Sequence, residues 1–522
     1  MSRKAWLRLT ALFAAVVILS TTGCTSLQDY VHNGFKVGPD YHCAQAPVAT
    51  KWIDAADARV RTESADTSRW WTAFHDPVLE ALVTNAYSQN LTLKQAGMRI
   101  FEARMQLNIA KGELFPQTQD LTGGYSRVAL AANPVTGQPQ YFMDQWSILN
   151  GGSASGFNLA WELDFWGRFR RAVESAEATL EASVDGYDDA MVTLLADVAT
   201  NYVAIRTSQQ RIKVAETAAK RQGELLRMVE ARFKAGTATK VDVDQLSTTV
   251  LQVEAQIPQF EITIRQAADH LCTLLGTPTY DLLQQIGNGP IPTAPSEVAV
   301  GIPANLLERR PDIREAERNA AAQSALIGVA QANLYPHISI NGTIGYQSPQ
   351  LSNLITPSAF QGSVGPSFQW NVLNYGRIVN DVRYQDAKFR ELLIAYQNTV
   401  LTANEETENG LVTFLRSQHQ ATILDHSVHD IQEAMDMAIP LYMAGTTDAK
   451  GAAVADLNRL VVLETTLVQQ QDAAALSRGQ IALGLIQIYK ALGGGWQLRC
   501  ENVTPVPINP PPEAIPLPSP PG

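Results

Sequence analysis

The sequence predicts a mainly α-helical protein with a small β part, built from one structural unit used twice. The landmark WELDFWGR at Trp161–Arg168 returns as WNVLNYGR at Trp370–Arg377. A turn sequence, AGT, occupies Ala235–Thr237 and Ala444–Thr446, and its two glycines are 209 positions apart, like the two glycines of the first landmark. At each WxxxxxGR landmark the hydrophobic period changes from two residues, typical of strands, to about 3.6, typical of helices.

The two copies differ in length before these landmarks. LFP at Leu114–Pro116 matches LYP at Leu334–Pro336, 220 positions later. The distance from Pro116 to Trp161 is 45 positions, whereas Pro336 to Trp370 is 34. We therefore expect an insertion in the first copy, before WELDFWGR.

Composition excludes some function classes. The chain has 522 residues, a net charge of −11 and 17% charged residues, below the usual share of about 25%. An acidic chain lacks the basic face that a nucleic-acid partner requires. The sequence contains no metalloprotease, phosphate-loop or nucleophile-elbow motif, so we expect no enzyme activity, no cofactor and no metal site.

The N-terminus has the pattern of a secretory signal over residues 1–23. A short basic region precedes an apolar run at Leu9–Leu19, which is too short for a mature spanning helix. Gly23-Cys24 resembles a bacterial lipoprotein cleavage site, although Thr21 stands where that pattern prefers leucine. We predict lipidation of Cys24; an ordinary signal peptide with an unmodified cysteine is the alternative.

Strand patterns occur before each glycine landmark. Apolar residues alternate with amide and hydroxyl residues in three runs, at 338–347, 360–372 and 157–165, and a fourth, poorly patterned run lies around Leu121–Leu130. Since nothing after residue 23 offers about 20 consecutive apolar residues, a mature membrane protein could span only as a closed barrel. A half-buried soluble sheet would have the same local pattern.

A long helix follows each landmark. Apolar residues recur at helical spacing from Val173 to Ile205 and again from Phe389 to Phe414. A helix over Arg168–Phe233 would be about 100 Å long, so it needs neighbouring helices in coiled-coil-like contact. Each ends at AGT, and a return helix follows, at about Val241–Leu275 and Ala453–Leu492.

These patterns give a domain organisation. The segments are a signal peptide (1–23), a lipid-anchored extended arm (24–69), a first repeat (70–287), a Pro/Gly linker (288–303), a second repeat (304–496) and a Pro-rich tail (497–522).

Several stretches resemble the TolC-like outer membrane efflux protein family, in its lipoprotein branch of OprM and NodT types. They are VGPDY, WWTAFHDPVLEALV, WELDFWGR, RFKAGTATKVDV, LLERRPDIREAE, LYPHISI and YKALGGGW. The resemblance implies a homotrimer in which each protomer gives four strands to a shared outer-membrane β-barrel and its long helices to a periplasmic α-barrel. It also implies a periplasmic membrane-fusion adaptor, an inner-membrane transporter of the RND type and outer membrane lipid as partners.

The resemblance also implies a periplasmic gate on the return helix after the second AGT. The family has Leu-Asp about nine residues past that glycine, whereas here Ala455-Asp456 stands eleven past Gly445. We predict Asp456 as the ring residue, with Asp448 and Lys450 as candidates nearer the turn. The alternative is that all three are merely solvated.

Further site predictions concern turns and cysteines. The predicted adaptor-contact residues are Gly236, Thr237, Asp242, Gly445 and Thr446, with Asp244 as a weaker candidate. A simple capping role explains both glycines without a partner. Gly167 and Gly376 are predicted to lie where barrel meets tunnel. Cys43 and Cys500 could form a disulfide or stay unbonded, and Cys272 is predicted to be a core residue.

The resemblance implies that the chain is an outer membrane channel subunit of a tripartite efflux system in a Gram-negative bacterium, a passive duct for small toxic compounds or drugs. Two alternatives remain: the duct of a type I protein secretion system, and a non-pore structural coiled-coil lipoprotein. His419, His426 and His429 share one predicted helix, where a metal or pH-sensing site is weighed against a solvated or interhelical stripe.

Overall fold

The structure, a computed structural model, describes residues 27–63, 66–130, 140–148, 150–151, 154–155, 157–444 and 456–501. It divides into two compact units. Unit 1 comprises Met1–Gln45, Arg99–Val184 and Glu315–Tyr396, and unit 2 comprises Ala46–Met98, Asp185–Arg314 and Gln397–Gly522. Each unit therefore draws segments from both repeats.

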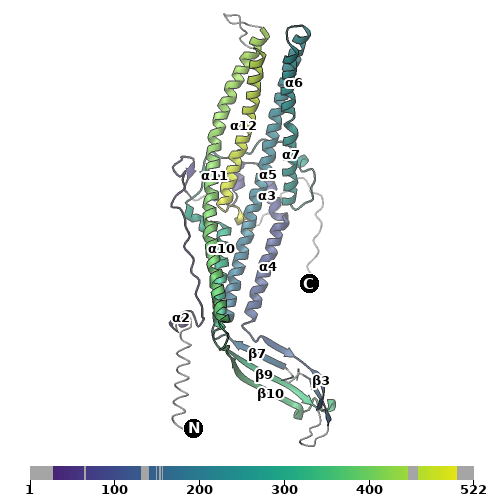
Figure 1. The fold of residues 1–522 in the computed structure, drawn as a ribbon, viewed down its shortest axis with the longest axis vertical. Helices are drawn as coiled ribbons and strands as arrows, with labels where there is room; N and C mark the ends of the chain where they lie inside the picture. Colours follow the sequence, from purple (N-terminus) through teal and green to yellow (C-terminus); the bar gives the residue numbers. More distant parts are fainter. Residues whose placement is uncertain are drawn as a thin grey trace. The chain divides into compact units, whose positions relative to one another are not determined.

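Helices make up most of the described chain (Figure 1). They are α2 Leu27–His32, α3 Pro77–Gln89, α4 Leu91–Gly112, α5 Arg168–Lys234, α6 Lys240–Glu254, α7 Ile257–Leu274, α8 Leu283–Ile286, α9 Leu306–Arg309, α10 Pro311–Ala332, α11 Arg377–Ala444 and α12 Leu457–Ala491. With 67 and 68 residues, α5 and α11 are the two long helices predicted after the landmarks. No helix in the described ranges combines the length and the apolar character needed to cross a bilayer.

Unit 1 contains one antiparallel sheet. Its strands are β2 Thr118–Leu121, β3 Gly124–Leu130, β4 Tyr141–Ile148, β7 Phe157–Leu163, β9 His337–Ser348 and β10 Phe360–Gln369. Strand β9 pairs with β10 on one side and with β7 and β4 on the other, while β2 pairs with β7 and β3 with β4 (Figure 1). The sheet therefore joins the two repeats through the β7–β9 pair. A short hairpin, β5 Asn150–Gly151 with β6 Ala154–Ser155, lies in the longer first copy.

The prediction of one return helix over Val241–Leu275 is wrong, because the structure has two helices there. Helix α6 ends at Glu254 and α7 begins at Ile257. Pro258 lies in the first turn of α7, where proline is tolerated because that turn has no intrahelical N–H bond to lose. In a continuous helix its ring would clash with the carbonyl four residues earlier.

The helical pattern predicted from Trp70 onward is also interrupted. A 3-10 helix at Trp70–Phe74 precedes α3, and Asn90 separates α3 from α4. The Asn90 side chain accepts a hydrogen bond from the Leu93 N–H at 2.7 Å and donates one to the Leu274 carbonyl at 2.8 Å. Asn90 thus caps α4 and ties it to the end of α7.

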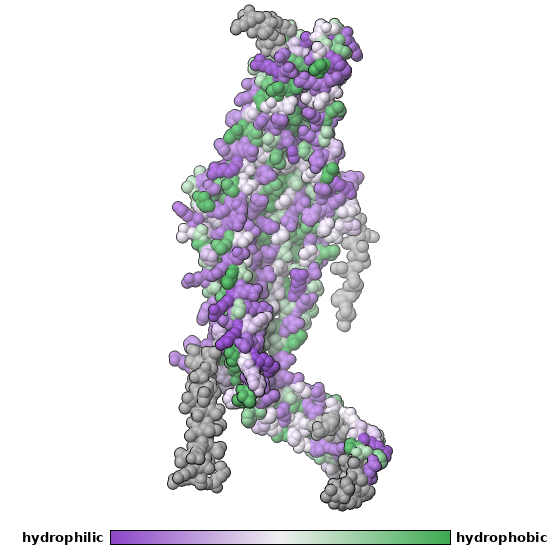
Figure 2. All heavy atoms as spheres, viewed as in Figure 1, coloured by the Kyte–Doolittle hydropathy of each residue, from purple (hydrophilic) through white to green (hydrophobic). Residues whose placement is uncertain are grey.

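In unit 2, two apolar clusters hold α5 and α6 against α11 and α12. One comprises Leu225, Val229, Val243, Leu246, Ala438, Leu457, Leu460 and Val461, and the other comprises Ala215, Ala218, Val253 and Val468. Fully burying each large aliphatic side chain contributes about 1.5–3 kcal/mol, so these clusters account for the neighbours that the long helices require. Hydrophobic and hydrophilic residues are interspersed along the visible helix faces in Figure 2.

The N-terminal arm of unit 1 docks where two glycines allow close approach. Gly38 has φ +90°, and a Cβ there would overlap the Cα of Gly328 in α10. The guanidinium of buried Arg171 donates to the carbonyls of Val37 at 3.1 Å and Gly38 at 3.0 Å. Tyr41 then packs on a cluster of small side chains on α5 and α10, namely Ala178, Ala321 and Ala322. The VGPDY motif therefore fixes the arm to the helices.

We predict that Gly38→Ala detaches the arm. The added methyl group meets backbone atoms of α10, which cannot move aside as a flexible side chain could. Limited proteolysis should then cut the arm at least tenfold faster, and thermal unfolding should begin at a lower temperature.

Gly34→Ala is the matched control. Gly34 also has a positive φ, +67°, but its added Cβ meets nothing within 4 Å. Equal proteolysis of the two variants would show that backbone strain, and not the close approach to Gly328, explains the effect.

Candidate functional site

The strand register sorts the sheet into one apolar face and one polar face. Opposite residues on the apolar face include Phe368 with Ile338, Phe360 with Tyr346, Trp161 with Ile340, Leu163 with Ile338 and Phe157 with Ile344. Several side chains on this face are exposed, among them Val364 at 78% and Phe368 at 76%. The period-two patterns therefore form a continuous apolar surface that lacks a cover within the described chain.

The opposite face carries a ladder of polar side chains. Cross-strand hydrogen bonds join Thr343 to Ser363 at 3.0 Å, Asn341 to Ser367 at 2.7 Å and Gln361 to Gln347 at 2.7 Å. Closer to the helices, the Glu162 carboxylate contacts His337 Nδ1 at 2.8 Å and accepts a hydrogen bond from Arg168 at 2.7 Å. An apolar face opposite a polar face is the distribution of a sheet with lipid on one side and water on the other.

The first strand-to-helix junction lies between β7 and α5. Gly167 has φ +79°, in the left-handed region that favours glycine. The Asp164 carboxylate accepts hydrogen bonds from the backbone N–H groups of Phe169 and Arg170, at 3.1 and 3.0 Å, and so caps α5. Arg170 also donates from its side chain to Asp164, at 3.0 Å.

The second junction has the same glycine conformation as the first. Gly376 also has φ +79°, and it lies between the end of β10 and the start of α11. Each landmark tryptophan binds its own repeat: Trp161 donates to the Leu114 carbonyl at 3.2 Å, and Trp370 donates to the Leu334 carbonyl at 3.0 Å. The two landmarks therefore share a glycine conformation and a tryptophan hydrogen bond.

The turn between α5 and α6 is closed by backbone bonds. The N–H of Gly236, at φ +77°, donates to the Phe233 carbonyl, and that of Thr237 donates to the Arg232 carbonyl, both at 2.9 Å. This pattern is a Schellman cap. Asp242 forms a capping box with Thr239, so this predicted contact residue also has a structural role.

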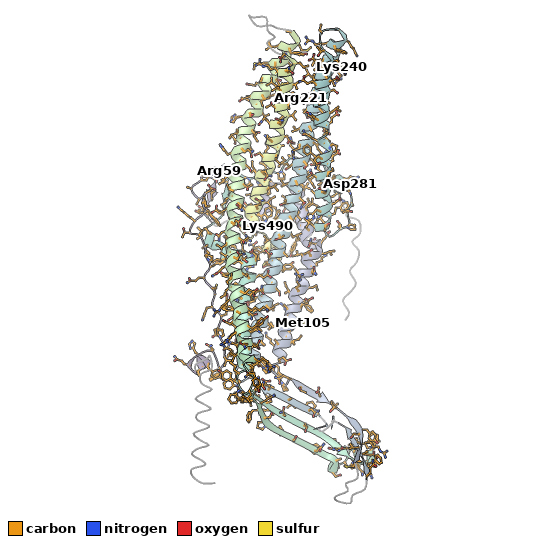
Figure 3. The ribbon with its side chains drawn as sticks, in the orientation of Figure 1. Arg59, Met105, Arg221, Lys240, Asp281 and Lys490 are labelled. Atoms are coloured by element: carbon orange, nitrogen blue, oxygen red, sulfur yellow. The ribbon has the colours of Figure 1, made fainter. Side chains whose placement is uncertain are left out.

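Charged side chains beside this turn are exposed. Lys240 forms an ion pair with Asp244 at 2.6 Å, and both side chains are about two-thirds exposed, at 66% and 61%. Figure 3 labels Lys240. Such a pair contributes little to stability. Its charges remain available to a partner.

Asp456, the predicted gate residue, is the exposed N-cap of α12. Its carboxylate accepts a hydrogen bond from the backbone N–H of Arg459 at 2.8 Å. The other gate and turn predictions on this side, Gly445, Thr446, Asp448 and Lys450, lie outside the described residues, as does Cys24.

A polar layer that the sequence reasoning missed lies between the two apolar clusters of unit 2. Glu464 on α12 is buried, and its Oε1 lies 3.2 Å from a guanidinium nitrogen of Arg221 on α5, without hydrogen-bond alignment. Figure 3 labels Arg221. Burial raises the pKa of the Glu464 carboxyl above its ordinary value, and Arg221 partly opposes the shift. The sequence signal that could have revealed this polar layer is a charged residue, Glu464, on the apolar face of a predicted helix.

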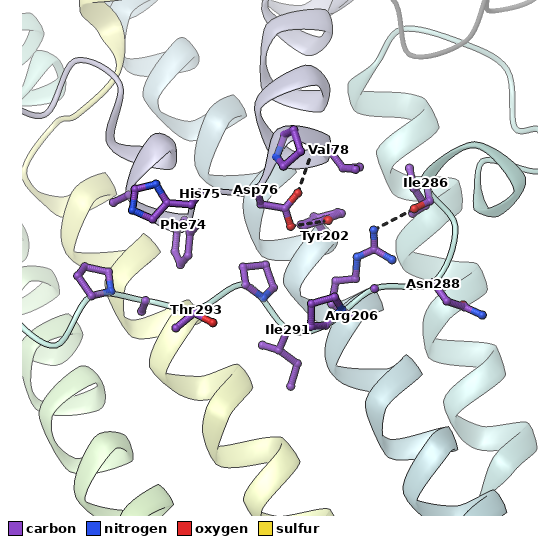
Figure 4. Close-up of a pocket in the computed structure, with 17 residues that line it drawn as sticks. Phe74, His75, Asp76, Val78, Tyr202, Arg206, Ile286, Asn288, Ile291 and Thr293 are labelled. Atoms are coloured by element: carbon purple, nitrogen blue, oxygen red, sulfur yellow. Dashed lines mark hydrogen bonds between the residues drawn. The ribbon is translucent and has the colours of Figure 1, made fainter.

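A cavity of about 640 Å³ in unit 2 lies between α3, α5 and the 286–295 segment (Figure 4). Asp76 accepts a hydrogen bond from the Tyr202 hydroxyl at 2.7 Å, and Arg206 donates to the carbonyls of Ile286 at 2.9 Å and Gly287 at 2.6 Å. Burial and the bond to Asp76 raise the pKa of Tyr202. These groups already bind each other and the chain, so they hold the linker against α5.

The described cysteines and histidines of the predicted sites form neither a disulfide nor a group that could hold a metal ion. Cys43 and Cys500 are exposed and free, and Cys272 is buried and free, in line with a core position. His429 contacts Glu433 at 3.4 Å. Within the described ranges no group of three or more His, Cys, Asp or Glu side chains could hold a metal ion.

The family model of the outer membrane efflux protein matches residues 82–277 and 302–494. The chain belongs to this family. Among its relatives, Nodulation protein T of Rhizobium leguminosarum bv. trifolii is 32% identical over 80% of this chain and 86% of that protein. The pyoverdine export outer membrane protein OpmQ of Pseudomonas aeruginosa is 31% identical over 84% of this chain and 89% of its own length.

Solved structures of channels have the same fold. The outer-membrane channel OprN superposes with a TM-score of 0.80 at 30% identity, covering 88% of this chain and 99% of OprN. The Campylobacter jejuni channel CmeC has a TM-score of 0.78 at 22% identity, covering 88% and 95% of the two chains, and supports the fold alone. This efflux protein is therefore an outer-membrane channel, and the prediction of an efflux channel subunit is confirmed.

We predict that Gly167→Ala impairs this efflux protein more than Gly376→Ala. Both substitutions place a side chain in the left-handed region, which costs roughly 1–2 kcal/mol. Only at Gly167 would the new Cβ also collide with the chain, 2.7 Å from the Lys36 Cβ and 2.8 Å from its Cα.

Yield of assembled protein and its thermal midpoint measure the difference. At Gly376 the nearest atom to an added Cβ is Asn380 Nδ2 at 3.7 Å, so Gly376→Ala is the matched control. Equal losses for both variants would contradict a role for the packed arm at the first junction.

Proposed function

We propose that three copies of this efflux protein form one ring, in which each copy contributes four strand runs to a shared β-barrel and its long helices to a periplasmic α-barrel. The observation that carries the proposal is the two-faced sheet with an open edge on each side. Within the described residues β10 pairs only with β9, and β2 only with β7. Long open edges with an apolar face are an aggregation hazard unless another strand covers them.

Strand direction supports closure by identical copies. Strands β10 and β7 both run antiparallel to β9, and β2 runs antiparallel to β7. Strand β10 therefore runs opposite to β2, so that β10 of one copy can extend the antiparallel sheet by pairing with β2 of the next. Contacts between two different edges of identical chains generate a closed ring when the rotation fits.

Exposed apolar stripes on two helices of unit 1 support the same head-to-tail contact. On α4, Phe101, Met105 and Ile109 are exposed at 58%, 37% and 60%, and they follow one another at intervals of four residues (Figure 3 labels Met105). On α11, Tyr384 and Ile394 are exposed at 61% and 66%. Helices with such stripes pack against another helix in stable assemblies.

The ring is proposed to act in a tripartite system with a periplasmic membrane-fusion adaptor and an RND-type inner-membrane transporter. The turn between α5 and α6, with Gly236, Thr237 and Asp242, would meet the adaptor. Cys24, if lipidated, would anchor the arm in the outer membrane. Two relatives are named for what they export, pyoverdine for OpmQ and toluene for a Pseudomonas putida protein TtgC, and we propose small toxic compounds as the class for this chain.

Purified full-length protein in planar bilayers tests the proposal. We expect trimers by mass measurement and ion conductance from the reconstituted protein, and a deletion strain should be more susceptible to drugs or solvents. Monomers without conductance, even after substitution of the gate, would overturn the proposal. Unchanged drug susceptibility combined with loss of a secreted protein would favour the secretion duct.

We predict that the channel prefers cations because of Asp456, and that Asp456→Asn removes this preference without destabilising the protein. Asparagine can still cap α12, whereas alanine cannot, and loss of the cap costs about 1 kcal/mol. Three aspartates around a threefold axis attract cations, and neither substitution keeps that charge. Reversal potentials in a salt gradient report the preference.

Asp456→Ala is the paired variant. It should lose the same cation preference and also unfold at a lower temperature than Asp456→Asn. If Asp456→Asn keeps the cation preference of the unsubstituted protein, Asp456 is a cap and not a gate residue.

A further inference from the structure

The second junction leaves apolar side chains uncovered. Val372, Leu373 and Tyr375 are exposed at 66%, 83% and 97%. Tyr375 also has φ +51°, a left-handed conformation that is costly for a bulky residue. A strained backbone that holds an aromatic ring in water indicates that something covers the ring in the assembled protein.

At the first junction, residues of the same chain cover the equivalent aromatic side chain. The residue equivalent to Tyr375, 209 positions earlier, is Trp166, and its ring is stacked on Tyr335 with centroids 4.5 Å apart. Trp166 also donates a hydrogen bond to the Pro336 carbonyl at 2.9 Å. Tyr335 and Pro336 belong to the LYP landmark of the second repeat, so the second repeat closes the first junction.

The corresponding landmark of the first repeat is uncovered. In LFP, Phe115 occupies the position of Tyr335, and it is 66% exposed. In the described part of the chain, neither Phe115 nor Tyr375 contacts another aromatic ring. The chain thus has one uncovered junction, at Tyr375, and one uncovered landmark, at Phe115. The two do not meet within a single chain.

The strands show why these two sites belong to different copies. Trp166 follows β7 and Tyr335 precedes β9, and β7 pairs with β9. Tyr375 follows β10 and Phe115 precedes β2, and each of these strands has an open edge in the described residues. Pairing β10 of one copy with β2 of the next would bring Tyr375 to Phe115 just as β7–β9 pairing brings Trp166 to Tyr335.

We propose that Tyr375 of one copy stacks on Phe115 of the next, so that each second junction is completed by a neighbouring chain. The proposal rests on the proposed ring and specifies the contact that closes it. Three junctions are then closed within chains and three between chains. Lipid is the competing occupant, and it would leave Phe115 and Tyr375 apart.

Chemical cross-linking tests the contact in the full-length protein. The variant carries Tyr375→Cys and Phe115→Cys, with the two exposed cysteines removed by Cys43→Ser and Cys500→Ser. After treatment with a short bis-maleimide, we expect covalent dimers and trimers on a denaturing gel. Either cysteine alone should leave only monomers.

The matched control pairs Phe115→Cys with Ile355→Cys. Ile355 is also exposed, at 78%, but it lies beyond the far end of β10, whose 10 residues extend about 33 Å. A ladder of equal strength in this control would overturn the contact. Intact trimers without a ladder in the test pair would overturn the contact and leave the ring standing, whereas absence of trimers in the unsubstituted protein would overturn the ring itself.

Single substitutions give an independent measurement. Tyr375→Phe keeps the ring and should leave the trimer-to-monomer transition temperature unchanged, whereas Tyr375→Ala and Phe115→Ala should each lower it. The double alanine variant should lower it no further than the stronger single variant. Additive shifts would mean that the two rings do not meet, and would overturn the contact.

Discussion

The structure depends on the change from strand to helix at Gly167 and Gly376. A strand exposes its polar backbone to its neighbours, whereas a helix satisfies it internally, so the change leaves unpaired N–H groups at the helix start. At the first junction the Asp164 carboxylate accepts hydrogen bonds from two of these N–H groups, and Gly167 supplies the left-handed turn before them. The sheet and the helices of unit 1 can be continuous in one chain because this turn is satisfied.

The two strand-to-helix junctions have different surroundings. At the first junction the N-terminal arm runs across the turn: the Val37 N–H donates to the Trp166 carbonyl at 3.0 Å, and Lys36 pairs with Glu174. At the second, Leu373 replaces Asp164, and the side chains face outward. The two junctions share the glycine conformation, and within the described residues only the first has an aromatic cover from its own chain.

Regular elements were predictable because their causes are local. The long helices follow from apolar residues at helical spacing, and the strand faces follow from alternation, which the β9–β10 register confirms. The break between α6 and α7 was missed, although Pro258 stood in the sequence as a stop signal. Because the apolar pattern continues on both sides of Pro258, it predicts one continuous helix in spite of the proline.

The sequence by itself determined the duplication, the helix and strand types, the glycine turns and the outer membrane efflux family. Only the tertiary structure decided which distant residues meet. Asp188 on α5 is fully buried and binds Arg499 at 2.7 Å and Arg314 at 3.2 Å. The Arg171 guanidinium holds the N-terminal arm by donating hydrogen bonds to backbone carbonyls of the arm. Periodicity sets which face of an element is apolar, but it carries no information about the partner of a buried charge. That partner is chosen by packing and by the cost of leaving the charge unpaired.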